Sequence, residues 1–108
     1  MHRVQYLPLA LEDLKNIVSY IAFKLEAPRA AKNLVNKIDK EIQKTAENPF
    51  RCHIYTPMGK LKYEYRILHV DNYSLFYKVD NEKIEIHRVL YSQMDIGRFL
   101  ATNQHERE

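Results

Sequence analysis

The stretch from Gly59 to Asp95 constrains the fold more than any other part of this chain. Apolar or aromatic residues alternate with polar ones over most of its length, and turn-forming residues interrupt the alternation twice. Side chains that alternate in this way lie on opposite faces of a β-strand. The stretch therefore predicts three consecutive antiparallel strands, over 61–69, 73–79 and 84–91.

The residues before this stretch predict one strand followed by two helices. Arg3 to Leu7 alternates like a short strand, and Pro8 both ends it and suits the first turn of a helix. Apolar residues then recur at steps of three and four, as in a helix with one buried face. Ala27-Pro28 interrupts the pattern, because the residue before a proline avoids helical geometry. The expected helices span 8–26 and 28–46, and the first carries its apolar stripe at Leu11, Leu14, Ile17, Val18, Ile21 and Leu25.

Together these elements predict an α+β fold with the order β-α-α-β-β-β. The short connection makes the two helices an antiparallel hairpin, so that both apolar stripes pack on one face of a mostly antiparallel sheet. A short C-terminal helical turn is expected at Ile96, Phe99 and Leu100, followed by a polar, frayed tail over 103–108. A length of 108 residues suits a single domain, 1–108.

Composition excludes several kinds of protein. No run approaches the roughly 18 apolar residues that a membrane helix needs, so we expect a cytoplasmic protein with no membrane partner. The single cysteine, Cys52, permits neither an internal disulfide nor a cysteine-based metal cluster, and the histidines lack metal-ligand spacing. We therefore expect no metal. A net charge of +3 is compatible with nucleic acid or an acidic protein as partner.

A tight turn at Asn81-Glu82 fixes the register of the last two strands. It places Val79 opposite Ile84, with both side chains facing the helices. Tyr77 then lies opposite Ile86 on the same face. The remaining residues of the strands lie on the opposite side of the sheet, which we call the open face.

The residue types expected on the open face match those that acid-base chemistry on a phosphate requires. Cleavage of RNA needs a base for the 2′-hydroxyl, an acid for the leaving oxygen and cations for the phosphate. The solvated side of any antiparallel sheet has a similar composition, so this alternative stays open. Arg88 falls on the helix side unless a bulge intervenes. The open face is expected to carry Lys62, Glu64, Arg66, Phe76, Lys78, Glu85, His87, Val89 and Tyr91.

Short motifs follow one another along nearly the whole chain. They are Leu7-Pro8-Leu9-Ala10-Leu11-Glu12-Asp13-Leu14, Ile17 with Tyr20-Ile21, Asn48-Pro49, Tyr65-Arg66-Ile67, Tyr73 to Val79, Ile84 to Tyr91, and Asp95. In this order and spacing the chain resembles the RelE/ParE superfamily, the toxins of type II bacterial toxin-antitoxin pairs. The resemblance implies a RelE-like fold with the element order already expected.

The superfamily contains two activities, and fold alone does not choose between them. RelE-like members bind the ribosomal A site and cleave mRNA there, which implies an mRNA interferase that inhibits translation by 2′-hydroxyl attack without metal or cofactor. ParE-like members inhibit DNA gyrase and have no recognised nuclease site. Either kind would pair with a cognate antitoxin, and operator DNA would be bound only through that antitoxin.

We take the ribosome-dependent endoribonuclease as the first hypothesis and the gyrase inhibitor as the alternative. The resemblance then assigns Arg66 to the phosphate, with Lys62 in support. Tyr91 stands where relatives often carry a histidine, and proton transfer falls to Tyr91, Glu64 or His87. Substrate binding is expected from Lys60, Lys78, Phe76 and Arg88.

Overall fold

The computed structural model describes residues 2–55 and 63–93 of the chain. Several expectations lie outside the described residues: the start of the strand expected over 61–69, the motif residue Asp95, the helical turn at Ile96, Phe99 and Leu100, and the tail over 103–108. Lys60 and Lys62 also lie outside them.

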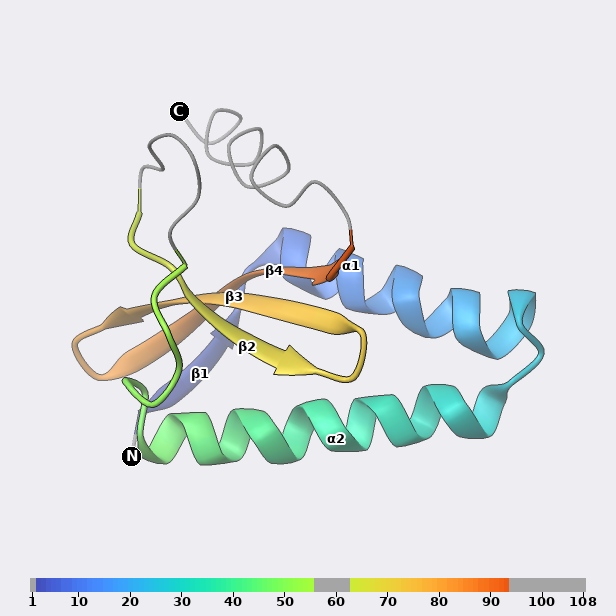
Figure 1. The fold of residues 1–108 in the computed structure, drawn as a ribbon, viewed down its shortest axis with the longest axis horizontal. Helices are drawn as coiled ribbons and strands as arrows, with labels where there is room; N and C mark the ends of the chain where they lie inside the picture. The colour runs from blue at the N-terminus through green and yellow to red at the C-terminus, as the bar shows by residue number, and fades with distance from the viewer. Residues whose placement is uncertain (1, 56–62, 94–108) are drawn as a thin grey trace.

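The element order agrees with the expected α+β fold (Figure 1). The elements are β1 (Arg3–Tyr6), α1 (Pro8–Ser19), the π-helical segment η1 (Tyr20–Lys24), α2 (Pro28–Glu47), β2 (Arg66–Val70), β3 (Tyr73–Asp80) and β4 (Lys83–Tyr91). Pro8 and Pro28 each occupy the start of a helix, where a missing backbone N–H costs nothing.

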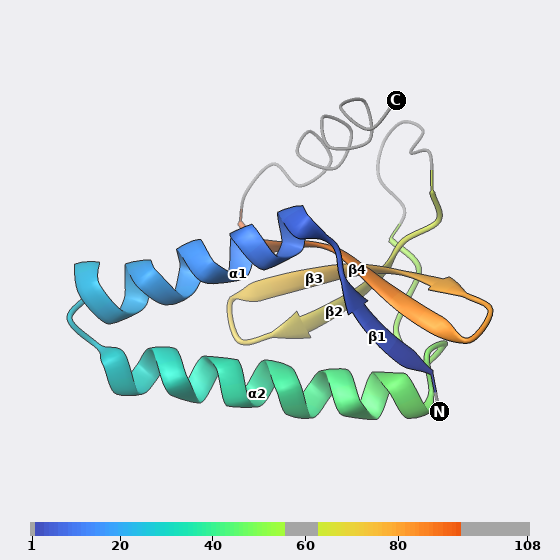
Figure 2. The same cartoon turned by 180° about the vertical axis from the view of Figure 1, so that it is seen from behind.

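The four strands form one mixed sheet in the order β1-β4-β3-β2. β1 runs parallel to β4, whereas the other neighbours are antiparallel, so the sheet is mostly antiparallel as predicted. Both helices lie on one face of this sheet as a hairpin (Figures 1 and 2). The opposite side is the open face.

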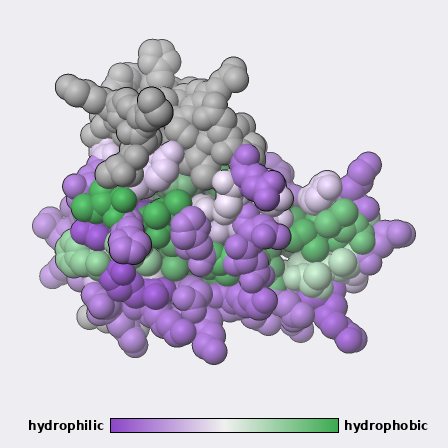
Figure 3. All heavy atoms as spheres, in the orientation of Figure 1, coloured by the Kyte–Doolittle hydropathy of each residue, from purple (hydrophilic) through white to green (hydrophobic). Residues whose placement is uncertain are grey.

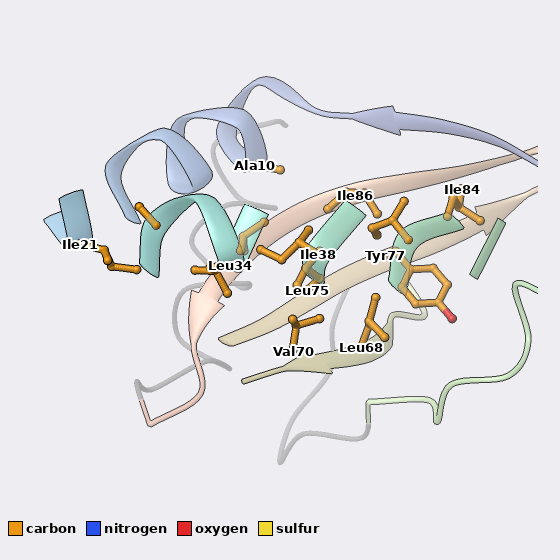
Figure 4. Packing of buried hydrophobic residues seen from close by; sticks show 13 residues of the cluster. Ala10, Ile21, Leu34, Ile38, Leu68, Val70, Leu75, Tyr77, Ile84 and Ile86 are labelled. Carbon is orange, nitrogen blue, oxygen red and sulfur yellow. The ribbon is translucent and has the colours of Figure 1, made fainter. Parts of the chain in front are cut away.

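The main core lies between the helical hairpin and the sheet. Its central residues are almost fully buried and come from both helices and three strands (Figure 4): Ala10, Ile21, Ala31, Leu34, Ile38, Ile42, Leu68, Val70, Leu75, Tyr77, Ile84, Ile86 and Val89. A second, smaller cluster on the open face comprises Tyr65, Phe76 and Leu90, with Tyr55, Tyr63 and Ile67 against it. Both faces of the sheet are therefore partly covered.

The register of the β3–β4 hairpin is confirmed at its turn, where Val79 pairs with Ile84 and Tyr77 with Ile86. One residue further a β-bulge shifts the register, so that Phe76 pairs with Arg88 and His87 is the extra residue. A bulge changes the parity of the strand beyond it. In the second half of β4, each side chain therefore lies on the face opposite to the one that uninterrupted alternation predicts.

The bulge makes two expectations wrong. Val89 and Tyr91 were expected on the open face, but they pair with Leu75 and Tyr73, which face the helices. Arg88, in turn, pairs with Phe76 and no longer falls among the helix-facing residues. The bulge thus removes the anomaly of a charged side chain directed into the main core.

The expected faces of the strand over 61–69 are also wrong. In β2 the residues that pack against the helices are Leu68 and Val70, and Ile67 belongs to the open-face cluster. Arg66 pairs with Tyr77 and so lies on the helix side. The alternation itself is correct, but the set that faces the helices is the other one, and both sets are partly buried because each face of the sheet has its own apolar cluster.

An ion pair joins α1 to the edge of β4 beyond the end of β1. Two nitrogens of Arg88, Nε and Nη2, donate to the Asp13 carboxylate over 2.7 and 2.9 Å, and the Val89 N–H donates to the same carboxylate over 3.0 Å. β1 pairs only with the first half of β4, up to Ile86. Asp13 therefore satisfies a strand-edge donor that β1 does not reach.

Replacing Asp13 with alanine should destabilise the fold by about 3 kcal/mol, because it removes the carboxylate that pairs with the largely buried Arg88 guanidinium and accepts from the Val89 N–H. The two side chains are only 12% and 14% exposed. Urea unfolding followed by circular dichroism measures the change.

The matched control is Lys37→Ala, which removes the exposed ion pair between Lys37 and Asp71. Its cost should stay below about 1 kcal/mol, since exposed pairs contribute little. Equal losses in the two variants would contradict the structural role given to Asp13.

Candidate functional site

The residues expected to form a nuclease site do not share one surface. His87, Lys78 and the fully buried Phe76 remain on the open face, whereas Arg66 and Tyr91 lie on the helix side. Lys60 and Lys62 lie outside the described residues. The structure therefore brings together only part of the expected set.

His87 sits at the centre of the polar group that the open face does assemble. Its Nδ1 lies 3.0 Å from the Tyr65 hydroxyl and its Nε2 lies 3.3 Å from the Glu85 carboxylate. The Tyr63 and Tyr65 rings pack edge-on against the imidazole. With 2% of its surface exposed, His87 is enclosed by these contacts.

Two lysines lie at the edge of the polar group formed by Tyr65, His87 and Glu85. Lys83 Nζ lies 3.2 Å from the second oxygen of the Glu85 carboxylate, and Lys78 Nζ lies over the Tyr63 ring at 4.9 Å from its centre. Burial, the largest contribution, raises the pKa of the Glu85 carboxyl, but the hydrogen bonds from His87 and Lys83 outweigh it and lower the pKa below its usual value. Glu85 is therefore ionised at neutral pH, and its two carboxylate oxygens contact Lys83 and His87.

Arg66 has a structural role on the other side of the sheet. It donates over 2.7 Å to the carbonyl oxygen of Cys52, and its guanidinium lies over the Phe50 ring at 5.0 Å from the centre. Close by, the Tyr77 hydroxyl donates over 2.8 Å to the carbonyl oxygen of Pro49. These contacts fix the segment after α2 against the sheet.

The remaining expected residues have separate surroundings. Tyr91 packs edge-on against Tyr73, with ring centres 5.9 Å apart, and is 38% exposed. Phe76 was expected to stack on a base, but this is wrong because it is fully buried against Tyr55. Arg88 is held by Asp13, and Glu64 is exposed in the segment before β2.

A hollow of about 340 Å³ lies between α2 and the β2–β3 turn. Carboxylates pair with two of the lysines that line it: Lys37 pairs with Asp71 at 3.3 Å and Lys44 with Glu41 at 3.2 Å. Hydrogen bonds from Lys44 and Arg51 lower the pKa of the Glu41 carboxyl, so it stays ionised at neutral pH. Three lysines and two carboxylates line the hollow, so the carboxylates balance its positive charge only in part.

Sequence reasoning missed an exposed apolar surface at the end of the helical hairpin. Leu25 was expected in the buried stripe of the first helix, but it is 54% exposed. Tyr20 and Phe23, which were not considered as surface residues, are 53% and 80% exposed. One feature of the sequence did indicate this exposure: Phe23 is not among the residues of the apolar stripe of the first helix.

Within the described ranges, no group of three or more His, Cys, Asp or Glu side chains is placed to hold a metal ion. No helix in the same part of the chain is long and apolar enough to cross a membrane.

Comparison with known proteins gives a family and a fold. The family model described as "ParE toxin of type II toxin-antitoxin system, parDE" matches residues 4–96. A solved structure titled "Chromosomal ParDE TA system from P. aeruginosa" is similar with a TM-score of 0.68 at 19% identity, covering 86% of this chain and 98% of that one. The RelB-RelE antitoxin-toxin complex from Methanococcus jannaschii aligns with a TM-score of 0.48 at 21% identity, covering 88% and 96% of the two chains. Comparison with curated protein sequences found no match.

Replacing Glu85 with glutamine should lower the free energy of unfolding at pH 7. A carboxyl whose pKa is lowered in the folded protein stabilises the fold above its unfolded pKa of about 4.5, and that contribution disappears as the pH falls through the lower folded value. The difference between wild type and variant should therefore vanish in acid. Urea unfolding measured stepwise between neutral and acidic pH tests this.

Glu82→Gln is the control, because Glu82 is an exposed carboxylate in the adjacent turn between β3 and β4. Its effect should be small at every pH. A Glu85→Gln effect that does not change with pH would show that the carboxylate charge is not what stabilises this group.

Proposed function

This chain belongs to the ParE family of toxins of type II toxin-antitoxin systems, and from that premise we propose that it inhibits DNA gyrase and is neutralised by a cognate antitoxin. The family match spans residues 4–96, which include every described helix and strand except the first residue of β1. The similar structure from P. aeruginosa is itself a toxin-antitoxin system, which supports an antitoxin partner. Contact with operator DNA would come through that antitoxin, and the toxin would act in the cytoplasm.

The separation of Arg66 from His87 is the observation that carries this proposal. Phosphate cleavage requires a base, an acid and a cation within hydrogen-bonding reach of one substrate. Arg66 instead lies on the helix side and donates to a backbone carbonyl, whereas His87 is enclosed on the open face. Tyr91 also lies on the helix side. A protein that acts by binding to its target needs no such convergence.

A ribosome-dependent mRNA endonuclease remains the second candidate, and one observation favours it. Glu85, His87 and Lys78 do gather beside Tyr63 on the open face, as acid-base and cationic groups of a nuclease would. Lys60, expected in substrate binding, and Lys62, expected to support Arg66 at the phosphate, belong to the segment outside the described residues. A site built from these residues would use His87 or Glu64 for proton transfer in place of Tyr91.

Induction of the toxin without antitoxin distinguishes the two candidates. We expect growth arrest with intact mRNA ends by primer extension, and we expect the purified protein to block supercoiling by purified gyrase. Tyr91→Phe should retain full inhibition, because the variant loses only a hydroxyl on a ring that packs against Tyr73.

Nuclease activity in place of gyrase inhibition would give a different set of results. Cuts in mRNA at the ribosomal A site, with supercoiling unaffected, would reject gyrase inhibition. Loss of those cuts in Tyr91→Phe would further restore the catalytic role that the resemblance implies for this tyrosine.

A further inference from the structure

Three large apolar side chains are exposed together where the helical hairpin turns. Tyr20 and Phe23 belong to η1 and Leu25 follows it, and their exposed fractions are 53%, 80% and 54%. We call these three residues the hairpin tip. A contiguous exposed apolar surface of this kind is characteristic of a protein interaction site.

The π-helical turn explains how the tip becomes exposed. The Leu25 N–H donates to the carbonyl of Tyr20, five residues back, and the Ala27 N–H donates to the carbonyl of Ile21. Ile21 lies in the main core within this wider turn, whereas Phe23 and Leu25 are exposed. Single π-helical turns inside α-helices occur frequently at functional sites.

The tip is a convex surface that extends away from the sheet. Both ribbon views place the hairpin turn well beyond the end of the strands (Figures 1 and 2), and η1 packs mainly on α1 and α2. The space-filling view shows hydrophobic atoms gathered at this end of the molecule, beside hydrophilic ones (Figure 3). A projecting apolar surface is complementary to a concave apolar site on a partner.

The charged residues around the tip are mostly basic. Lys24, Arg29 and Lys32 are exposed in η1 and the first turns of α2, and Glu26 is the exposed acid between them. Three cations against one anion give the tip a basic surround. Electrostatic complementarity therefore favours a partner surface rich in carboxylates.

We propose that the hairpin tip inserts into an apolar, carboxylate-bordered pocket on the protein that the toxin inhibits, and that the antitoxin binds elsewhere. The convex shape decides between these partners, because a pocket requires a folded protein with a concave surface, whereas an extended segment binds along grooves and strand edges. Phe23, the most exposed of the three, is the anchor residue. The identification of the target as gyrase rests on the function proposed above; the role of the tip in reaching the target does not.

Phe23→Ser tests the proposal, with Leu11→Ser as the matched control. Leu11 is also a large apolar residue of the first helix and is 52% exposed, but it lies in the first turns of α1, far along the chain from the tip. Neither change removes a core contact, so both variants should fold. Four measurements apply to each: growth arrest after induction, inhibition of gyrase supercoiling, co-purification with the antitoxin, and the size of the isolated protein in solution.

Growth arrest and supercoiling inhibition should require about tenfold more of the Phe23→Ser variant than of wild type, since aromatic anchors dominate interface energies. Antitoxin binding and molecular size should not change. Leu11→Ser should match wild type in all four measurements. Phe23→Leu, which keeps an apolar side chain, should restore most of the lost activity.

Three results would overturn the proposal. Full growth arrest by Phe23→Ser would show that the tip does not reach the target. Loss of antitoxin binding would assign the tip to the antitoxin, and conversion of a dimer to a monomer would assign it to a second copy of the chain. A different outcome is that wild type arrests growth without inhibiting gyrase while Phe23→Ser fails to arrest growth. In that case gyrase is not the target, but the hairpin tip still binds the protein that the toxin inhibits.

Discussion

The β-bulge at His87 determines which side chains each face of the sheet presents. Before the bulge, the pairing of Tyr77 with Ile86 keeps both apolar side chains in the main core. The extra residue then changes the parity of β4, so that Val89 fills the core and Arg88 is free to reach the Asp13 carboxylate at the strand edge. Without that shift a guanidinium would face the apolar core and Val89 would face outward.

The packing of the helical hairpin depends on this arrangement. Asp13 joins α1 to β4 through Arg88 and the Val89 N–H, and it does so where β1 has ended. At the opposite end of the sheet, Arg66 and Tyr77 bind the carbonyl groups of the segment after α2. Polar side chains that resemble catalytic groups in the sequence thus hold the two layers together, which leaves the helical hairpin as the most exposed apolar part of the described structure.

A toxin of this family must combine two kinds of binding, one to its target and one to the antitoxin that neutralises it. The structure offers different surfaces for them: a convex apolar tip, a hollow beside α2 lined by lysines and carboxylates, and a sheet face partly covered by aromatic rings. The enclosed group of Tyr65, His87 and Glu85 stiffens the third of these surfaces.

The sequence by itself determined the element order, the α+β class and the register of the β3–β4 turn. Alternation over Tyr73–Asp80 and three-four periodicity over Pro28–Glu47 are local properties, and the family motifs followed from the same residues. Tertiary structure alone decided the faces. Alternation sorts a strand into two sets but does not say which set is buried, so the place of Arg66 depended on contacts from distant residues. The bulge at His87 and the π-helical turn before Leu25 likewise arise because packing against other elements outweighs the regular local pattern.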